Sequence, residues 1–496
     1  MTRLRSGACP RPSLEALLDV PGRRAAAWLR AFALAVALGS LLPALPALAG
    51  SHTWSGAVSG VWSVAGNWSA GGAPVNGETN VQLDFPNGMS NMAPMTNDLV
   101  GLNVTSIAFH DTAYAVTGNA VNLGGPVWID GGVATASAYL AIDVTLTADS
   151  TFQVHGSPDL GITFAGVIGG PHGVEVQRIG GSGSPIATFA GANTYTGTTT
   201  VTSGYLQVDA ASGLGSTSAG TVVSSGGTLR PYHVALAAEP LSVAGSGNSG
   251  NGALQLYGAS VSGPIALTNH ATFVTVETSV VSGLISGSWG VDYRVFDGQT
   301  LTLTADNTYF ASSDLHFGTV AVNGNQPASG WFIHGSGGSP STLGGIGRVG
   351  SVLPVAGTSA KRVDPGVPGN IGILHTSAFS LNDTPNGNHA VLHVYLEGTA
   401  PGTQHDQVSV TGTVDVTSAT LEVDLGYVPS LLDTFVIVAN DGIDAVFGTF
   451  AGLPEGATFV SGGRTFQVSY VGGTGNDVTL TVTSLTPVTL QGFTAE

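Results

Sequence analysis

Cysteine is almost absent from the sequence. Its only cysteine, Cys9, lies inside an N-terminal segment that we expect to be removed. The remaining chain then has no disulfide, no thiolate metal site and no cysteine nucleophile, although an exported protein is free to form disulfides. Long apolar runs are missing as well. No segment after residue 49 reaches about 18 uninterrupted apolar residues, so we expect no transmembrane helix.

Charge is also scarce, and basic residues are the scarcer kind. Only 9% of the residues are charged, and removal of residues 1–49 leaves 7 basic against 29 acidic residues, a net charge of −22. Such a surface repels nucleic acid and anionic lipid, so we expect neither as a partner. Disorder is not expected, because the chain is 43% hydrophobic and rich in Val and Thr. This mixture suits many short strands joined by tight turns.

The first 49 residues have the pattern of a secretory signal peptide. Arginines precede an apolar run over 31–42, and the sequence Ala-Leu-Ala directly before Gly50 forms a small-x-small cleavage site. A membrane anchor is the alternative, but the apolar run is too short for one. We therefore expect an exported protein that begins at Gly50.

One segment recurs 114 residues later in the chain. The stretch NTYTGTTTVTSGYLQVD (193–209) aligns without gaps with NTYFASSDLHFGTVAVN (307–323). An asparagine begins each copy and suits a corner, because Asn tolerates left-handed backbone and bonds to its own main chain. Gly204 and Gly318 are expected to supply positive φ at the next corner.

Apolar and polar side chains alternate after each glycine. Leu206 and Val208 are expected to point one way, while Tyr205, Gln207 and Asp209 point the other. We find no long amphipathic helix after residue 50. The same period of two predicts three further half-buried strands, within 299–305, 419–426 and 477–483.

The stretch FAGANTYTGTTTVTSGYLQV (189–208) closely resembles the autotransporter-associated β-strand repeat of bacterial passenger domains and related secreted proteins. Segments at 398–416, 440–459 and 466–482 resemble the region that follows such repeats in that family. The second copy departs from the pattern, because YFASSD replaces the usual Thr/Gly run. The resemblance implies a right-handed parallel β-helix with a structural or adhesive role more often than a catalytic one. The chain ends soon after its last passenger-like strand, so we expect no translocator barrel.

Together these patterns predict an all-β chain: a right-handed parallel β-helix (solenoid) preceded by a signal peptide. At about 20 residues per coil, the chain from residue 50 onward would form about twenty coils. The expected order is a signal peptide at 1–49, a Trp-containing N-terminal cap with the first coils at 50–135, a β-helix at 136–340 with repeats at about 185–209 and 299–323, a passenger-like β-rich region at 341–484 and a tail at 485–496.

Three tryptophans, Trp54, Trp62 and Trp68, cluster at the N-terminal end of the predicted solenoid. An open coil exposes unpaired strand edges, so a solenoid needs a cap at its end. We therefore expect these rings to pack in the core and the cap. The alternative is a platform on which carbohydrate rings stack.

Two motifs have the spacing of metal sites. His389 and His393 would form a zinc pair on a helix, but on the strand expected here they lie about 13 Å apart, too far to share an ion. We expect both on the solvent face. Asp477, within GGTGNDVTL (472–480), matches the start of a calcium-roll repeat, but a roll needs stacked copies. A closing hairpin turn is therefore the favoured interpretation.

A β-helix can also carry a polysaccharide lyase or a glycoside hydrolase, which need clustered carboxylates and often a basic residue. Glu422 and Asp424 share the outer face of one strand and are the candidates, although a solvated face explains them equally well. The basic residues are scattered along the chain. Only Lys361 and Arg362 are adjacent in the sequence. His405 and Asp406 are also adjacent, but we expect them in a turn.

We therefore expect no catalytic, cofactor-binding or metal-binding residues, and no enzyme. The expected function is that of an exported structural or adhesin-like protein that acts by extended surface contact. The alternative is a carbohydrate-binding or polysaccharide-cleaving β-helix protein. We expect a monomer whose partners are polysaccharide or cell-surface components, with no nucleic acid. It would be secreted or at the cell surface of a Gram-negative-type bacterium, or in its periplasm.

Overall fold

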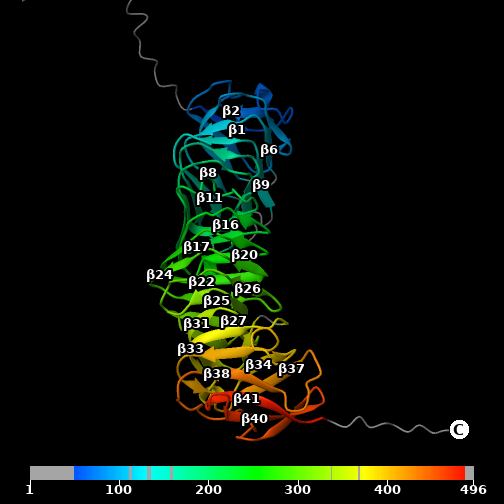
Figure 1. The fold of residues 1–496 in the computed structure, drawn as a ribbon. Coiled ribbons are helices and arrows are strands. Elements are labelled where there is room, and N and C mark those ends of the chain that lie inside the picture. The colour runs from blue at the N-terminus through cyan, green and yellow to red at the C-terminus, as the bar shows by residue number, and fades with distance from the viewer. Residues whose placement is uncertain are drawn as a thin grey trace, which may run out of the picture. The chain divides into compact units, whose positions relative to one another are not determined.

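The computed structural model describes residues 50–110, 114–130, 136–156, 160–181, 183–336, 338–366 and 369–485. The predicted signal peptide, and the predicted tail from residue 486 onward, lie outside the described residues. The described chain is almost entirely strand and turn, and its strands stack as the parallel coils of a β-solenoid (Figure 1). The predicted β-helix is therefore confirmed.

Each coil passes through three faces in a fixed order, and each face is a parallel sheet built from successive coils. We call them face 1, face 2 and face 3. β8 (Val127–Ile129) lies on face 1, β9 (Ala136–Ala141) on face 2 and β10 (Val144–Leu146) on face 3. β11 (Ser150–His155) then returns to face 1, where it pairs with β8.

The other strands fall into five groups. On face 1 are β1 (Ser51–Trp54), β3 (Val81–Phe85), β14 (Val174–Ile179), β19 (Leu241–Gly245), β24 (Ile285–Gly287), β28 (Asn325–Gln326), β35 (Gln407–Val410) and β38 (Thr434–Asn440). On face 2 are β4 (Met95–Asn97), β6 (Ala115–Gly118), β12 (Leu160–Phe164), β15 (Ile186–Phe189), β20 (Leu254–Tyr257), β25 (Val291–Val295), β29 (Trp331–Gly335) and β36 (Val414–Asp415). On face 3 are β7 (Val121–Leu123), β13 (Ile168–Gly169), β18 (Ala235–Leu236), β21 (Ser260–Val261), β23 (Ser279–Val281), β26 (Thr300–Leu303), β30 (Ser341–Gly345), β32 (Lys361–Pro365), β34 (Ala390–Leu396) and β37 (Thr420–Leu425). Strands that bend across a corner onto a second face are β5 (Asn103–Phe109), β16 (Thr199–Val208), β17 (Thr221–Pro231), β22 (Ile265–Glu277), β27 (Ser313–Val322), β31 (Arg348–Gly357) and β33 (Ile373–Ser380). Antiparallel strands at the two ends are β2 (Trp68–Ala70), β39 (Thr458–Ser461), β40 (Arg464–Gly472) and β41 (Asp477–Leu485).

The length of a coil varies along the solenoid. The number of residues between paired positions of successive coils measures the coil length. This separation is larger for Val144 and Ile168 than for Phe273 and Tyr293, so the later of these two coils is shorter. The separation between paired residues increases again in the C-terminal coils, where Leu392 pairs with Leu421. The coil length assumed from the sequence is therefore too short for much of the chain, and the coils are fewer than predicted.

The two copies of the sequence repeat have corresponding buried asparagines. The Asn193 side chain accepts the N–H of Ile168 at 2.8 Å, and the Asn307 side chain accepts the N–H of Ile285 at 2.7 Å. Neither asparagine is among the residues with positive φ. The expectation of a left-handed corner that bonds its own main chain was therefore wrong. The amide bonds the main chain of the preceding coil instead, because a buried N–H at a corner needs a partner.

Two further features recur in both copies. The Tyr195 hydroxyl lies 2.5 Å from Thr199 Oγ1, and the Tyr309 hydroxyl lies 2.6 Å from Ser313 Oγ, so each buried tyrosine bonds a hydroxyl four residues later. The glycines that follow have φ of 78° at Gly204 and 80° at the equivalent Gly318, which confirms the prediction of positive φ there.

The second copy lies one face further around the solenoid than the first. β16 turns from face 1 to face 2 at its glycine, whereas β27 turns from face 2 to face 3. When the strand pairing is followed from coil to coil, Leu206 of the first copy reaches Leu315 of the second. The sequence alignment, in contrast, matches Leu206 with Val320. The repeat therefore encodes a corner and its two flanking strands, and it functions at more than one corner.

The alternation of side chains holds with one exception. Leu206 and Val208 are fully buried in the core, and Asp209 is exposed, as predicted. Tyr205 is on the outer side of β16 but is only 2% exposed. The Arg230 guanidinium covers its ring, and Asn251 donates a hydrogen bond to its hydroxyl at 2.7 Å.

Antiparallel strands close both ends of the described solenoid. At the N-terminal end β2 pairs with β1. The three tryptophans pack against one another and against Phe85, and the ring centroids of Trp54 and Trp68 are 5.1 Å apart. All three rings are buried, so they form part of the core rather than a carbohydrate platform. At the C-terminal end, strands β38 to β41 form antiparallel pairs. Paired edges of this kind protect a solenoid from end-to-end association.

The only lysine of the sequence is completely buried. Lys361 Nζ lies 2.8 Å from the Asp383 carboxylate and donates to the Gly357 carbonyl at 2.9 Å, and neither charged side chain is exposed. The next residue, Arg362, lies on the outer side of β32, because successive side chains of a strand alternate. The two adjacent basic residues therefore do not form one basic site.

Replacement of Asn193 or Asn307 by alanine is expected to lower the free energy of unfolding by about 1–3 kcal/mol, because each change leaves a buried N–H without its acceptor. Urea unfolding of the purified chain measures this. Asn87, exposed in a turn, is the matched control, and Asn87→Ala should change stability by less than about 0.5 kcal/mol. Equal effects at the three positions would contradict the role assigned to the buried amides.

Lys361→Met is expected to lower the free energy of unfolding by about 3–5 kcal/mol, because it leaves the Asp383 carboxylate buried without a cation. The neighbouring change Arg362→Met removes a partly exposed pair and should cost about 1 kcal/mol or less. Amine-reactive labelling of the native chain supplies a second measurement. Labelling of Lys361 before unfolding would contradict its complete burial.

Candidate functional site

The outer side of face 2 carries a column of side chains from six successive coils. Adjacent strands of a sheet lie about 4.8 Å apart, so the column spans about 24 Å. The alternate residues of the same strands are buried in the core. We call this set the face 2 column, and its members in order are Gln207, Arg230, Gln255, Val274, Arg294 and Phe317.

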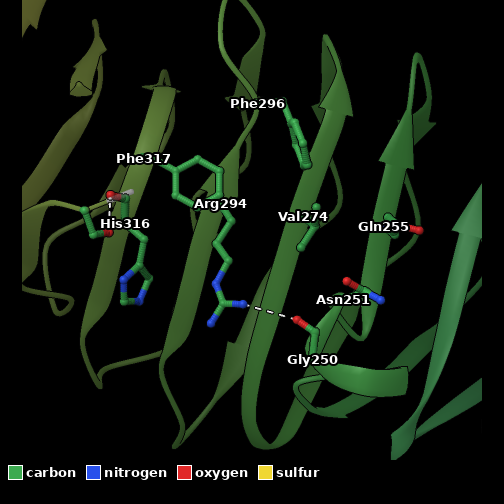
Figure 2. Close-up of a pocket in the computed structure, with 9 residues that line it drawn as sticks. Gly250, Asn251, Gln255, Val274, Arg294, Phe296, His316 and Phe317 are labelled. Carbon is green, nitrogen blue, oxygen red and sulfur yellow. Dashed lines mark hydrogen bonds between the residues drawn. The ribbon is translucent and has the colours of Figure 1, made fainter. Parts of the chain in front are cut away.

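A cavity of about 380 Å³ lies over the C-terminal half of the column. Two loop residues, Gly250 and Asn251, line it together with strand residues that include Arg294, Phe296 and Phe317. Figure 2 shows the Arg294 side chain reaching toward the loop, with both phenylalanine rings at the end of the cavity away from the loop. The cavity thus combines a cation, aromatic rings and backbone carbonyls.

Strand β25 places Arg294 by simple alternation. Val291, Tyr293 and Val295 are fully buried, so Asp292 and Arg294 lie on the outer side. Arg294 Nη1 donates to the Gly250 carbonyl at 3.2 Å, and Nη2 lies 3.7 Å from Asp292. Aromatic residues flank the strand at both ends, and both are about half exposed: Trp289 and Phe296.

Two more arginines lie close to the column. The Arg230 guanidinium stacks between the rings of Tyr205 and Tyr257, 4.5 and 5.3 Å from their centroids, a cation–π arrangement. Arg178 donates to the Asn248 side chain at 3.1 Å. Asn248 begins the short helix η2 (Asn248–Gly250), so arginines hold this loop at both of its ends.

Histidines and aspartates of successive coils pair beside the cavity. Asp292 lies 2.9 Å from His270 and 3.6 Å from His316, and Asp314 lies 3.0 Å from His334. Burial alone would raise the pKa of Asp292, but hydrogen bonds from His316 and His270 outweigh it and lower the pKa to about 2. The Asp292 carboxylate therefore stays ionised and helps to orient Arg294.

The C-terminal candidates form a separate cluster on face 3. His393 lies on the outer side of β34, as predicted, because Leu392 and Val394 are in the core. Its side chain is nevertheless only 13% exposed, because it lies between Asp364, at 3.0 Å, and Asp424, at 3.1 Å. The hydrogen bond with Asp364 raises its pKa, although burial opposes the shift. Glu422 pairs with Arg362. His389 lies in the turn before β34 and is partly exposed.

The remaining candidates have structural roles. His405 and Asp406 follow the predicted turn but are themselves buried, and Asp406 accepts the N–H groups of Gly372 and Tyr395 at 2.8 Å. Burial raises the pKa of Asp406 to about 7, against the effect of these two bonds. Asp477 closes the turn between β40 and β41, where it accepts the N–H of Asn440, so the hairpin is confirmed.

The residues of the cavity were not predicted from the sequence. Residues that line it come from coils as far apart as positions 250 and 336, and only the register of the coils brings them together. One local signal was present: the segment SWGVDYRVF (288–296) alternates core residues with Asp and Arg between two aromatic residues.

Comparisons with protein-family models, curated proteins and solved structures return no match for this chain. The resemblance to the autotransporter-associated repeat therefore stays a prediction. No helix among the described residues is long and apolar enough to cross a membrane. Within the same ranges, no group of three or more His, Cys, Asp and Glu residues is arranged to hold a metal ion.

Asp292→Asn is expected to lower the free energy of unfolding at pH 7 by about 2 kcal/mol, from a folded pKa of about 2 against 3.8 in the unfolded chain. A lowered folded pKa contributes stability that is present above the unfolded value and lost as the pH falls toward 2. The difference from wild type should therefore shrink below about pH 4. Unfolding at several pH values measures it. The exposed Asp297→Asn, in the same coil, is the control; a constant difference at all pH values would contradict the role of Asp292.

Proposed function

We propose that this chain is an exported structural protein of the adhesin-like kind, which acts by extended surface contact and performs no catalysis. The observation that carries the proposal is the face 2 column. Stacked parallel coils place side chains from six coils in one outer row that includes two guanidinium groups. Gln255 and Val274 in this row are largely covered, and exposed aromatic rings lie beside it. Contact along such a row is multivalent, so weak contacts add up to useful affinity.

Carbohydrate binding is the second candidate function, and the cavity beside Arg294 and Phe296 favours it. Cleavage is less well supported. The two carboxylates expected to serve as acid and base, Glu422 and Asp424, are engaged by Arg362 and His393 and lie on face 3, away from the cavity on face 2. The geometry therefore favours binding over hydrolysis or elimination.

Deletion of the gene from the producing bacterium is expected to reduce attachment, biofilm formation or cell aggregation, because the extended contact surface is lost. Attachment of the deletion strain, with and without a plasmid copy of the gene, measures this. Cell fractionation and the N-terminal sequence of the same chain test export and cleavage before Gly50. Unchanged attachment, biofilm and aggregation, or a chain retained in the cytoplasm, would contradict the proposal.

A further inference from the structure

We infer that the cavity and column of face 2 bind a carboxylated polysaccharide, with the Arg294 guanidinium on a uronate carboxylate and the Phe296 ring against a sugar face. The inference rests on the proposed function, since it names the partner of the same surface.

The arginines of the chain are concentrated at this surface. Residues 50–485 contain six arginines, and three of them, Arg178, Arg230 and Arg294, lie on or beside the face 2 column. The rest of the chain is strongly acidic, with 29 carboxylate residues after residue 49. The guanidinium groups therefore make this surface more favourable to an anionic ligand than the acidic surface elsewhere on the chain.

Arg294 retains hydrogen-bonding capacity for a ligand. A guanidinium has five N–H donors in a planar fork, and Gly250 accepts one of them at 3.2 Å. Asp292 is 3.7 Å from Nη2, but its carboxylate is shared with His270 and His316. The side chain is one third exposed at the cavity, so it can pair with a carboxylate through two parallel bonds.

Aromatic rings supply the second element of sugar recognition. Phe296 is 49% exposed and Phe317 lies 6.2 Å from it in an edge-to-face arrangement, so both rings border the same cavity. Exposed rings have no role in the solenoid core, and an apolar ring face suits the apolar C–H face of a sugar. Charge and aromatic surface together select an acidic sugar rather than a small inorganic anion.

The column is long enough for a polymer. Arg230 and Arg294 are three coils apart, which is about 14 Å at about 4.8 Å per coil. A chain of several sugar units spans this distance, whereas one monosaccharide does not.

Calorimetric titration of the full chain with polygalacturonate and alginate tests the inference. Their neutral counterparts are methyl-esterified polygalacturonate and dextran. The wild-type chain should bind at least one acidic polymer and should bind the neutral ones at least tenfold more weakly. Arg294→Gln and Phe296→Ala should each weaken binding about tenfold. Arg294→Lys should restore only part of the loss, because lysine keeps the charge but lacks the fork.

Arg464→Gln is the matched control, since Arg464 is in the C-terminal hairpin and bonds the Pro429 carbonyl. It should bind like wild type. Thermal unfolding shows whether each variant is folded, and Phe296→Ala provides a second readout if Arg294→Gln is unstable. Equal loss in Arg294→Gln and Arg464→Gln, equal binding of esterified polymer, or tighter binding of single-stranded DNA would overturn the inference. Absence of binding to every polymer, with attachment still lost in the deletion strain, would overturn the inference but leave the proposed function in place.

Discussion

In-register parallel pairing between successive coils is the constraint on which the rest of the structure depends. Each coil satisfies its backbone hydrogen bonds on the coils before and after it, so residues that are distant in the sequence become neighbours. The core is the narrow space enclosed by the three faces of each coil. The inward-pointing Val, Leu, Ile and aromatic side chains of the strands fill it. Columns of equivalent side chains follow on both the inner and the outer side of every face.

Corners are the places where this pairing is hardest to satisfy, and the chain meets the need with buried polar side chains. Asn193 and Asn307 reach back to the preceding coil, and the neighbouring tyrosines hydrogen-bond a hydroxyl across the turn. The same corner unit occurs at two different corners of the coil. The unit therefore needs only an adjoining coil beside it, and the offset between the two copies need not be a whole number of coils.

These facts explain which features could be predicted from the sequence. The alternation of Leu206 and Val208, and the positive φ of Gly204 and Gly318, are short-range properties, and both predictions were confirmed. The bonding of the asparagine amides was missed, because their partners belong to another coil. The burial of Tyr205 was missed for the same reason, since its cover comes from Arg230 and Asn251.

The same distinction applies to the candidate site. Glu422 and Asp424 are close in sequence and share one outer face, yet each contacts a side chain from an earlier coil. Arg294 did not stand out in the sequence, yet register places it beside the distant loop at Gly250 and near Phe317 of the next coil. In a solenoid with so few basic residues, the position of each arginine determines where an acidic ligand can approach. The binding specificity that we propose for this chain is thus a property of coil register more than of any local motif.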